Sequence, residues 1–506
     1  MKNLNILCSL RTYLLYCIFI NCLPSTAEVA ATLSTSVGSS KMNILFIVVD
    51  DLRPELGVYG VKQVKSPNID KLAQNGIFFQ KAYSQAPICG ASRISVLTGM
   101  YVHSTKIYGI ALKKKEQLPH VDSLPMHLKK NGYNTVSVGK IYHHNDDDTQ
   151  AWSKPPFRAI NGSGYVTDEA KELVTLNQKS NPNAGTKGPP TEAADVADYE
   201  HHDGRVARRA IDEIENLDRT VPFFLAVGFR KPHLPFTPPK KYWDMYNPSL
   251  ISAASNPYFP DNFTKHTMNN YGELRNYYGM PRGRLEIAPD VAQHLKHGYY
   301  ASVTFIDAQI GKILNALKVN GLEESTIVVV FGDHGYKLGE HKSWVKHTAL
   351  EIDSRVPLIV KVPNYNPVIK STRSIVELVD LYPTLLDLNA LAQPEHLEGE
   401  SFAPILQNPK LPFKHAALSV WVGKRYRYDI ENQIVGYALQ TDRYRYIEYQ
   451  RTVTDQVVAR ELYDHHKDPT ENYNVVQKVN YKSTVAKLSK IMKEKLMIQK
   501  KRSDVK

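Results

Sequence analysis

The feature of this sequence that most constrains its fold is a set of four short runs of apolar, mostly β-branched residues separated by helix-like segments. Continuous apolar runs of this length are typical of strands buried on both faces, and their alternation with helices predicts a parallel sheet covered on both sides. The chain of 506 residues is long enough for such a core and a further unit. The runs are residues 43–49, 135–138, 222–227 and 326–331.

Charged or imidazole side chains follow closely on each of these runs. In open α/β sheets the carboxyl ends of parallel strands meet at one edge, and ligands bind there. Polar residues also begin wherever a strand reaches the surface, but four strands that all end in this chemistry favour a functional site at the edge. The residues concerned are Asp50, Asp51, Lys140, His143, His233, Asp333 and His334.

Beyond about residue 409 the pattern of the chain changes. Tyrosine-rich segments alternate apolar and polar residues, which is typical of an antiparallel sheet. The last segment, 483–506, has four apolar residues at helical spacing among basic ones, and this predicts a terminal helix packed on the rest of the chain. The predicted strands include 435–439, 444–449 and 459–463.

These patterns together predict an α/β fold. We expect a large mixed, mostly parallel sheet sandwiched by helices over residues 41–409, and a smaller C-terminal antiparallel-sheet subdomain with a terminal helix over 410–506. The formal charge of +12 favours an anionic partner without identifying it, and a merely soluble basic surface explains it equally well. No P-loop, zinc-finger spacing or dinucleotide fingerprint occurs in the sequence, and we expect no nucleic-acid partner.

The N-terminus has the pattern of an export signal. Basic residues are followed by a short apolar stretch, and small residues at 25–27 suit cleavage, so we expect a signal peptide over 1–27 and a flexible lead-in over 28–40. The apolar stretch is too short for a transmembrane anchor. The protein is therefore expected to be secreted or periplasmic, or lysosomal if the host is an animal.

The cysteines fit this reading. Three of the four, Cys8, Cys17 and Cys22, lie in the predicted signal peptide, which leaves Cys89 alone in the mature chain. A single thiol cannot form an internal disulfide, so stability must come from the buried core. A lone cysteine is usually a small buried apolar residue, but the neighbours of Cys89 suggest another role.

The segment that begins at Cys89 reads Cys-Gly-Ala-Ser-Arg and is followed by Leu-Thr-Gly at 97–99. It resembles the signature of the sulfatase family, Cys-x-Pro-Ser-Arg with a following Leu-Thr-Gly. Ala91 stands where proline is usual, and the minimal family pattern accepts either. The resemblance implies a sulfuric ester hydrolase of the alkaline phosphatase superfamily, in which a formylglycine-generating maturation enzyme oxidises Cys89 and the hydrated aldehyde is the nucleophile.

The resemblance also implies one divalent metal ion, and calcium is the expected one. Hard cations prefer carboxylate oxygens, which Asp50, Asp51 and Asp333 supply from two strand ends, with residue 89 completing the site. His334 stands where many sulfatases have asparagine. Because imidazole is a softer ligand than calcium prefers, ligand type leaves manganese and zinc open.

Further residues match the catalytic positions of the family. Lys140 and His143 look like its Lys-x-x-His, in which lysine binds the sulfate and histidine stabilises or deprotonates the diol. His233 and Lys346 look like the pair that binds the bridging oxygen and protonates the leaving alcohol, a role that suits a histidine near neutral pKa. Arg93, with the metal, would activate the hydroxyl at residue 89.

Several motifs resemble those of iduronate-2-sulfatases in sequence, although two positions differ from them. Tyr336 stands where those enzymes have tryptophan, and Gln440 where they have arginine, so a strict iduronate specificity is not implied. A sulfated, uronic-acid-containing glycan ranks first as substrate, and an ulvan-type algal polysaccharide with another sulfated sugar stays open. The matching motifs are 49–57, 137–140, 231–236, 333–336, 338–341 and 379–385.

Two other functions compete with this reading. A phosphatase or phosphonate hydrolase of the same superfamily would use the same strand ends and differ only in the ester that turns over. A catalytically silent glycan-binding protein on the same scaffold would keep Cys89 as a thiol and bind polyanions through its basic surface.

Overall fold

The computed structural model describes residues 41–144, 146–159, 164–267, 272–283, 286–422 and 433–504, with side chains through 497. The predicted signal peptide, 1–27, and lead-in, 28–40, lie outside the described residues. The described residues belong to one compact unit that begins at Lys41. None of their helices is long and apolar enough to cross a membrane.

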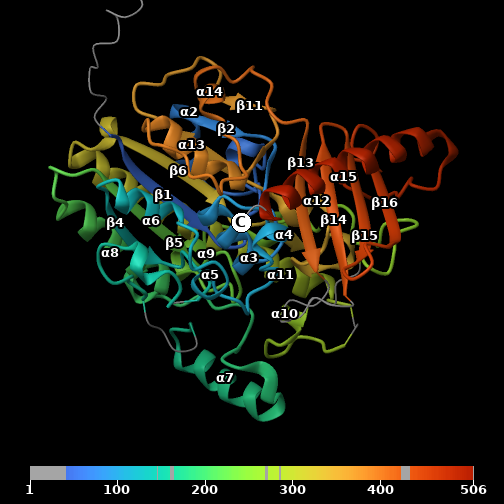
Figure 1. Ribbon diagram of the computed structural model, residues 1–506. Coiled ribbons are helices and arrows are strands. Elements are labelled where there is room, and N and C mark those ends of the chain that lie inside the picture. The colour runs from blue at the N-terminus through green and yellow to red at the C-terminus, as the bar shows by residue number, and fades with distance from the viewer. Residues whose placement is uncertain are drawn as a thin grey trace, which may run out of the picture. The chain divides into compact units, whose positions relative to one another are not determined.

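The large sheet has seven strands and confirms the predicted class (Figure 1). Its central strands are parallel, and the neighbour on one side, β10, is antiparallel to them, so the sheet is mixed and mostly parallel. All four predicted runs are strands in it. In sheet order the strands are β11 (Ser371–Thr372), β2 (Ile77–Phe79), β10 (Leu358–Lys361), β6 (Thr326–Gly332), β1 (Asn43–Val49), β5 (Phe223–Phe229) and β4 (Asn134–Gly139).

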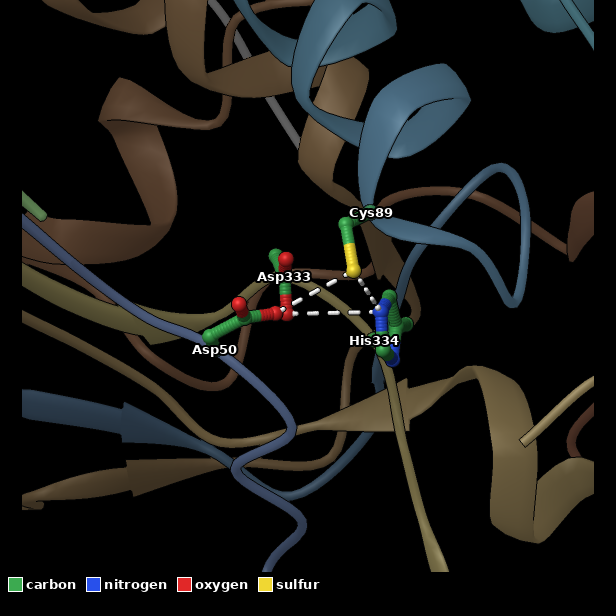
Figure 2. A group of neighbouring side chains, drawn as sticks. All are labelled: Asp50, Cys89, Asp333 and His334. Atoms are coloured by element: carbon green, nitrogen blue, oxygen red, sulfur yellow. Dashed lines mark hydrogen bonds and ion pairs between the residues drawn. The ribbon is translucent and has the colours of Figure 1, made fainter. Parts of the chain in front are cut away.

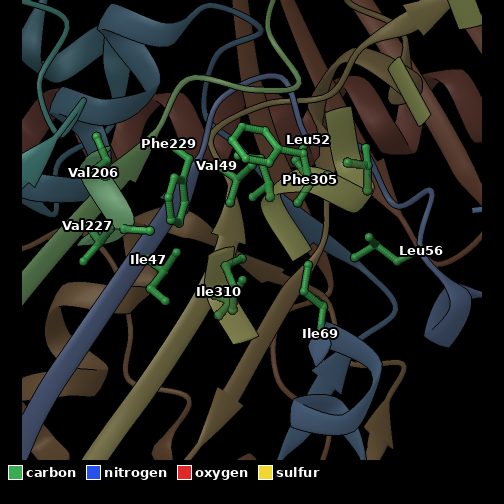
Figure 3. Packing of buried hydrophobic residues seen from close by; sticks show 14 of the residues in the cluster. Ile47, Val49, Leu52, Leu56, Ile69, Val206, Val227, Phe229, Phe305 and Ile310 are labelled. Carbon is green, nitrogen blue, oxygen red and sulfur yellow. The ribbon is translucent and has the colours of Figure 1, made fainter. Parts of the chain in front are cut away.

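Both faces of this sheet are buried under helices. Alternate residues of β1 belong to different cores: Ile47 packs in one cluster and Phe46 in the other. Figure 3 shows part of the first cluster, where Ile47 and Val49 lie among side chains of the covering helices. The first face is covered by α2 (Pro67–Asn75), α8 (His202–Glu215) and α11 (Pro289–Val319), and the second by α3 (Cys89–Thr98), α6 (Leu124–Lys130) and α13 (Leu381–Leu388).

The predicted C-terminal antiparallel sheet is also present. Its four strands pair in chain order, and one face packs against Leu488 and Met492 of the terminal helix α15 (Lys482–Asp504). The other face packs on Ala349 and Leu350, a few residues after Lys346. The boundary at residue 409 stays a prediction. The strands are β13 (Ala416–Val422), β14 (Ile434–Thr441), β15 (Tyr444–Arg451) and β16 (Val457–Asp464).

Smaller elements connect these layers. One of them, α7 (Asp168–Ser180), lies in a polar stretch rich in Gly, Pro and Asn, for which the sequence predicted no helix. Its Thr167 side chain accepts a hydrogen bond from the backbone N–H of Ala170 and caps the helix. The others are β3 (Ala82–Tyr83), β7 (Lys337–Leu338), β8 (Trp344–Val345), β9 (Arg355–Val356), β12 (Val376–Glu377), α4 (Val102–Thr105), α5 (Lys114–Gln117), α9 (Lys240–Trp243), α10 (Gly272–Arg275), α12 (Glu351–Ser354) and α14 (Ala403–Gln407).

Candidate active site

The carboxyl ends of β1 and β6 lie side by side and form the floor of the candidate site. Val49 pairs with Gly332 in the parallel register, so the two acidic pairs that follow are neighbours. The backbone N–H of Asp51 donates to Asp333 Oδ1 at 3.1 Å. Asp51 has a φ of 62°, a left-handed conformation that non-glycine residues adopt rarely and that clusters at functional sites.

Cys89 is the first residue of α3 and is buried against this floor. Its Sγ atom lies 3.2 Å from Asp50 Oδ1 and 3.2 Å from His334 Nε2 (Figure 2). The start of a helix carries unpaired backbone N–H groups and the positive end of its dipole, so it favours negative charge at residue 89.

Four side chains converge within a small volume around this thiol. Ligand-type atoms of Asp50, Cys89, Asp333 and His334 lie within 4.8 Å of one another, and all four residues are buried. Two carboxylate oxygens and an imidazole nitrogen at this spacing are donors that a divalent cation can bind. The arrangement therefore fits a metal ion.

The cationic side chains of the site make their shortest contacts with the outer oxygens of these acids, while Arg93 Nη2 also lies 3.8 Å from the inner Oδ1 atom of Asp50. Lys140 pairs with Asp50 Oδ2, and Arg93 Nε donates to Asp333 Oδ2 at 2.8 Å. The Oδ1 atoms of both acids are turned toward the thiol and the imidazole, as Figure 2 shows. The inner oxygens therefore lie near the thiol and the imidazole, outside the shortest contacts of the chain's own cations.

The electrostatics of the cluster match this geometry. Burial alone would raise the pKa of Asp50, but Lys140, His233 and Arg93 hold that pKa well below its usual value. Burial alone would lower the pKa of His334, yet Asp333 and the Cys89 thiol raise it to about 10. The cluster therefore attracts positive charge at its centre.

Lys140 and His143 reach the site from the end of β4. Gly139 has a φ of 81°, and a Cβ there would lie 2.2 Å from the Gly228 carbonyl oxygen, so the turn into Lys140 requires glycine. Burial and the nearby Lys140 charge lower the pKa of His143 to about 2, which keeps its imidazole neutral. No described residue forms a hydrogen bond with the buried Nδ1 atom of His143.

Lys346 and His233 lie on the other side of Asp51. Lys346 Nζ donates to both Asp51 oxygens, at 2.8 and 2.9 Å, and His233 Nε2 lies 4.0 Å from Asp51 Oδ2. Asp51 therefore groups with Cys89 and His233, whose candidate ligand atoms lie within 4.8 Å of its own, and it is outside the set of four described above.

The backbone around Lys346 is strained. Val345 and His347 have φ values of 65° and 87°. A β-branched residue in this region is a genuine outlier, and surrounding structure must hold it there. Here the pairing of Lys337 with Val345 in the β7–β8 hairpin and the burial of Trp344 do so.

The two positions that depart from the iduronate enzymes have different surroundings. Tyr336 is buried, and its ring centroid lies 5.8 Å from Lys346 Nζ, which makes it a neighbour of the site. Gln440 is buried in the C-terminal sheet, where its side chain donates to the Thr441 carbonyl at 2.9 Å and lies 3.3 Å from His465.

One site residue was not predicted from the sequence. Glu273 on α10 places its Oε1 atom 3.0 Å from His233 Nε2 and its Oε2 atom 3.3 Å from Lys346 Nζ. A single acid on a short helix carries no sequence pattern, so only the tertiary structure reveals it.

The fold and this edge of the sheet define a hydrolase of the alkaline phosphatase superfamily. The sulfatase family model matches residues 42–390, and a model of the C-terminal region of N-sulphoglucosamine sulphohydrolase matches residues 339–499. The chain belongs to the sulfatase family and is a sulfuric ester hydrolase. Members of this family generally use a metal ion and formylglycine.

Known relatives span nearly the whole chain. It is 31% identical to iduronate 2-sulfatase of Mus musculus, with 86% of this chain and 90% of the relative covered. It is 29% identical to a sulfatase of Formosa agariphila, with 89% and 86% covered. Among solved structures, a protein in complex with its substrate D-glucosamine-2-N,6-O-disulfate shares the fold at a TM-score of 0.71 and 22% identity, covering 92% of this chain and 99% of that one.

Proposed function

We propose that this chain is an exported sulfatase that uses formylglycine at residue 89 to hydrolyse sulfate esters of a sulfated, uronic-acid-containing glycan. The observation that carries the proposal is the position of Cys89, at the start of α3 and 3.2 Å from both Asp50 and His334. The names of the relatives support a glycan substrate, since two of them are iduronate 2-sulfatases.

The Cys89 cluster supplies the residues that would hold the proposed cofactors. A calcium-type ion would be held by Asp50, Asp333, His334 and residue 89, with Asp51 beside them. The ion supplies charge neutralisation and the formylglycine supplies a hydroxyl nucleophile. Because one ligand is imidazole, manganese or zinc is the alternative ion.

The chain's own residues bind the sulfate, hold the metal-binding acids in place and transfer protons. Lys140 and Lys346 bind the sulfate oxygens, and Arg93 holds Asp333 in place through its 2.8 Å contact. Burial and the Lys140 charge lower the pKa of His143, which keeps its imidazole neutral, so the ring can accept a hydrogen bond from the hydroxyl at residue 89. His233 donates a proton from Nε2 to the oxygen of the leaving alcohol.

The substrate test compares ester classes in protein matured at residue 89. We expect sulfate release from an aryl sulfate and from sulfated uronic-acid disaccharides, with kcat/KM at least about a hundredfold above that for the matching phosphate and phosphonate esters. Faster turnover of the phosphorus esters would overturn the proposal in favour of a phosphonate hydrolase. Sulfate release from ulvan oligosaccharides alone would support the sulfatase activity but change the proposed substrate to an ulvan-type glycan.

Export and the domain boundary belong to the same proposal. Cleavage after residue 27 leaves the lead-in 28–40 ahead of the catalytic domain, 41–409, and the C-terminal subdomain, 410–506. Sequencing the N-terminus of the protein recovered from the periplasm or medium tests the cleavage. A protein that retains Met1 in the cytoplasm contradicts it.

A further inference from the structure

The unpredicted carboxylate of Glu273 bridges two residues of the site. Its side chain is only 11% exposed, and its oxygens lie 3.0 Å from His233 Nε2 and 3.3 Å from Lys346 Nζ. No part of the family signature or of the metal cluster includes it. Its position between these two groups therefore calls for a role of its own.

The His233 ring is held at both nitrogens. Nδ1 lies 2.7 Å from the carbonyl oxygen of Leu234, and Nε2 faces Glu273. The backbone at this point is fixed in turn by Lys231, whose Nζ donates to the carbonyls of His233 at 3.0 Å and Pro235 at 2.6 Å. At the other end of the ring, the Glu273 carboxylate lies nearer to Nε2 than Asp51 does, at 3.0 against 4.0 Å.

Lys346 is held in a comparable way. Its Nζ donates to Asp51 on one side and lies against Glu273 on the other. If Lys346 binds an anion, the neighbouring Glu273 carboxylate weakens that binding. The carboxylate and the anion are both negative, and they repel strongly where water is largely excluded. A contribution to substrate affinity therefore does not explain Glu273.

We propose that Glu273 is a positioning residue that sets the distance and orientation of His233 and Lys346 for protonation of the leaving alcohol. This inference rests on the proposed function. In that step a bond forms between sulfur and the nucleophile at residue 89, the bond between sulfur and the alcohol oxygen breaks, and the proton on His233 Nε2 passes to the alcohol oxygen. Glu273 orients the ring before the alcohol oxygen of the substrate takes its place at Nε2, and the carboxylate is not itself changed.

The leaving group provides the test. A sugar sulfate releases a poor leaving group and needs the acid, whereas an aryl sulfate releases a stable phenolate and needs it far less. In Glu273→Gln we expect the ratio of kcat on the sugar sulfate to kcat on the aryl sulfate to fall by at least about tenfold, since a general acid contributes roughly 10²–10⁴-fold. KM is expected to stay the same or to fall, because a like charge has been removed.

Two further variants separate positioning from folding. Glu273→Asp keeps the charge and should retain more of the ratio than Glu273→Gln. Glu286→Gln removes a carboxylate that pairs with the partly exposed Lys342, and it should leave the ratio unchanged.

Each other outcome is decisive. An unchanged ratio in folded Glu273→Gln overturns the inference and leaves the sulfatase proposal standing. An equal loss on both esters with a lower melting temperature assigns Glu273 a structural role and also overturns it. A matured wild-type protein that releases sulfate from neither ester overturns the proposed function, and the inference with it.

Discussion

Buried carboxylates converge in two regions of this molecule, and the regions differ in where the balancing cation comes from. In the first region, the Lys414 cluster, Glu377 and Asp380 both contact Lys414 Nζ, so the chain itself supplies the central cation. In the second, the cluster around Cys89, Lys140 and Arg93 make their shortest contacts with the outer oxygens, and ligand-type atoms of four residues converge within 4.8 Å of one another.

This difference separates a structural use of buried charge from a functional one. Lys414 lowers the pKa of Glu377 to about 2, against the effect of burial, and ties the start of the C-terminal region to β12. The Cys89 cluster also combines buried acids with basic side chains, yet its arrangement suits an ion that the chain does not supply. In this molecule the buried acids of the candidate site are those whose inner oxygens lie outside the shortest contacts of the chain's own cations.

The largest expected effect comes from removing the thiol that becomes the nucleophile. Cys89→Ala should lower sulfatase turnover by at least about a thousandfold, because the nucleophile is lost. Its melting temperature should stay near that of the wild type, since only one small buried atom is removed. Calorimetry and an aryl sulfate assay check both. Substantial activity in this variant would contradict the functional reading of the cluster.

Removing the cation of the Lys414 cluster should lower stability and leave catalysis nearly unchanged. Lys414→Met removes the cation that contacts both Glu377 and Asp380 and leaves Glu377 with the more distant Lys495, 3.8 Å away, so we expect a loss of about 3–5 kcal/mol in the free energy of unfolding. The kcat of the protein that remains folded should change less than about twofold. Denaturant unfolding and an activity assay of the same sample measure the two quantities. A Lys414→Met protein with lower kcat and unchanged stability would contradict a purely structural role for the Lys414 cluster.

Calcium should stabilise the protein through the Cys89 cluster. Adding Ca²⁺ to chelator-treated protein at a hundred times its Kd should raise the free energy of unfolding by about 2.7 kcal/mol. Asp333→Asn should weaken this response. Lys414→Met should show the same gain on calcium addition, starting from a lower free energy of unfolding. Calorimetry at several calcium concentrations measures the response. An equal response in wild type and Asp333→Asn would place the ion elsewhere.

A smaller effect is expected at a third buried pair, Arg53 and Glu340, which lie 2.9 Å apart. Burial opposes ionisation of Glu340, but Arg53 lowers the pKa of this carboxyl to about 2. The folded pKa is below the unfolded value, so the pair stabilises the protein above pH 4.5 and loses its effect as the pH falls toward 2.

Glu340→Gln should therefore cost roughly 2 kcal/mol at neutral pH. The difference from wild type should shrink below pH 4.5 and vanish near pH 2. Denaturant unfolding at several pH values follows the difference. A difference that is independent of pH would show that the pair contributes through packing and not through charge.

The sequence predicted most of the fold and most of the residues that converge at the candidate site, because the signal is local. Residues 43–49 are a continuous apolar run that ends in two acids, and they form β1 within the predicted bounds. The prediction missed α7, whose few apolar positions leave its helical periodicity weak. It also missed Glu273 and the Lys414 cluster, because only tertiary packing brings together residues so far apart in the chain.

The central claim is that the thiol inside the second cluster is the precursor of the nucleophile. Its most direct test is the mass of the peptide containing residue 89, measured beside sulfate release in the same preparation made with a formylglycine-generating enzyme. We expect a formylglycine at residue 89, and sulfate release in proportion to the modified fraction. An unmodified thiol in protein that still releases sulfate, or a formylglycine in protein that releases none, would contradict the account.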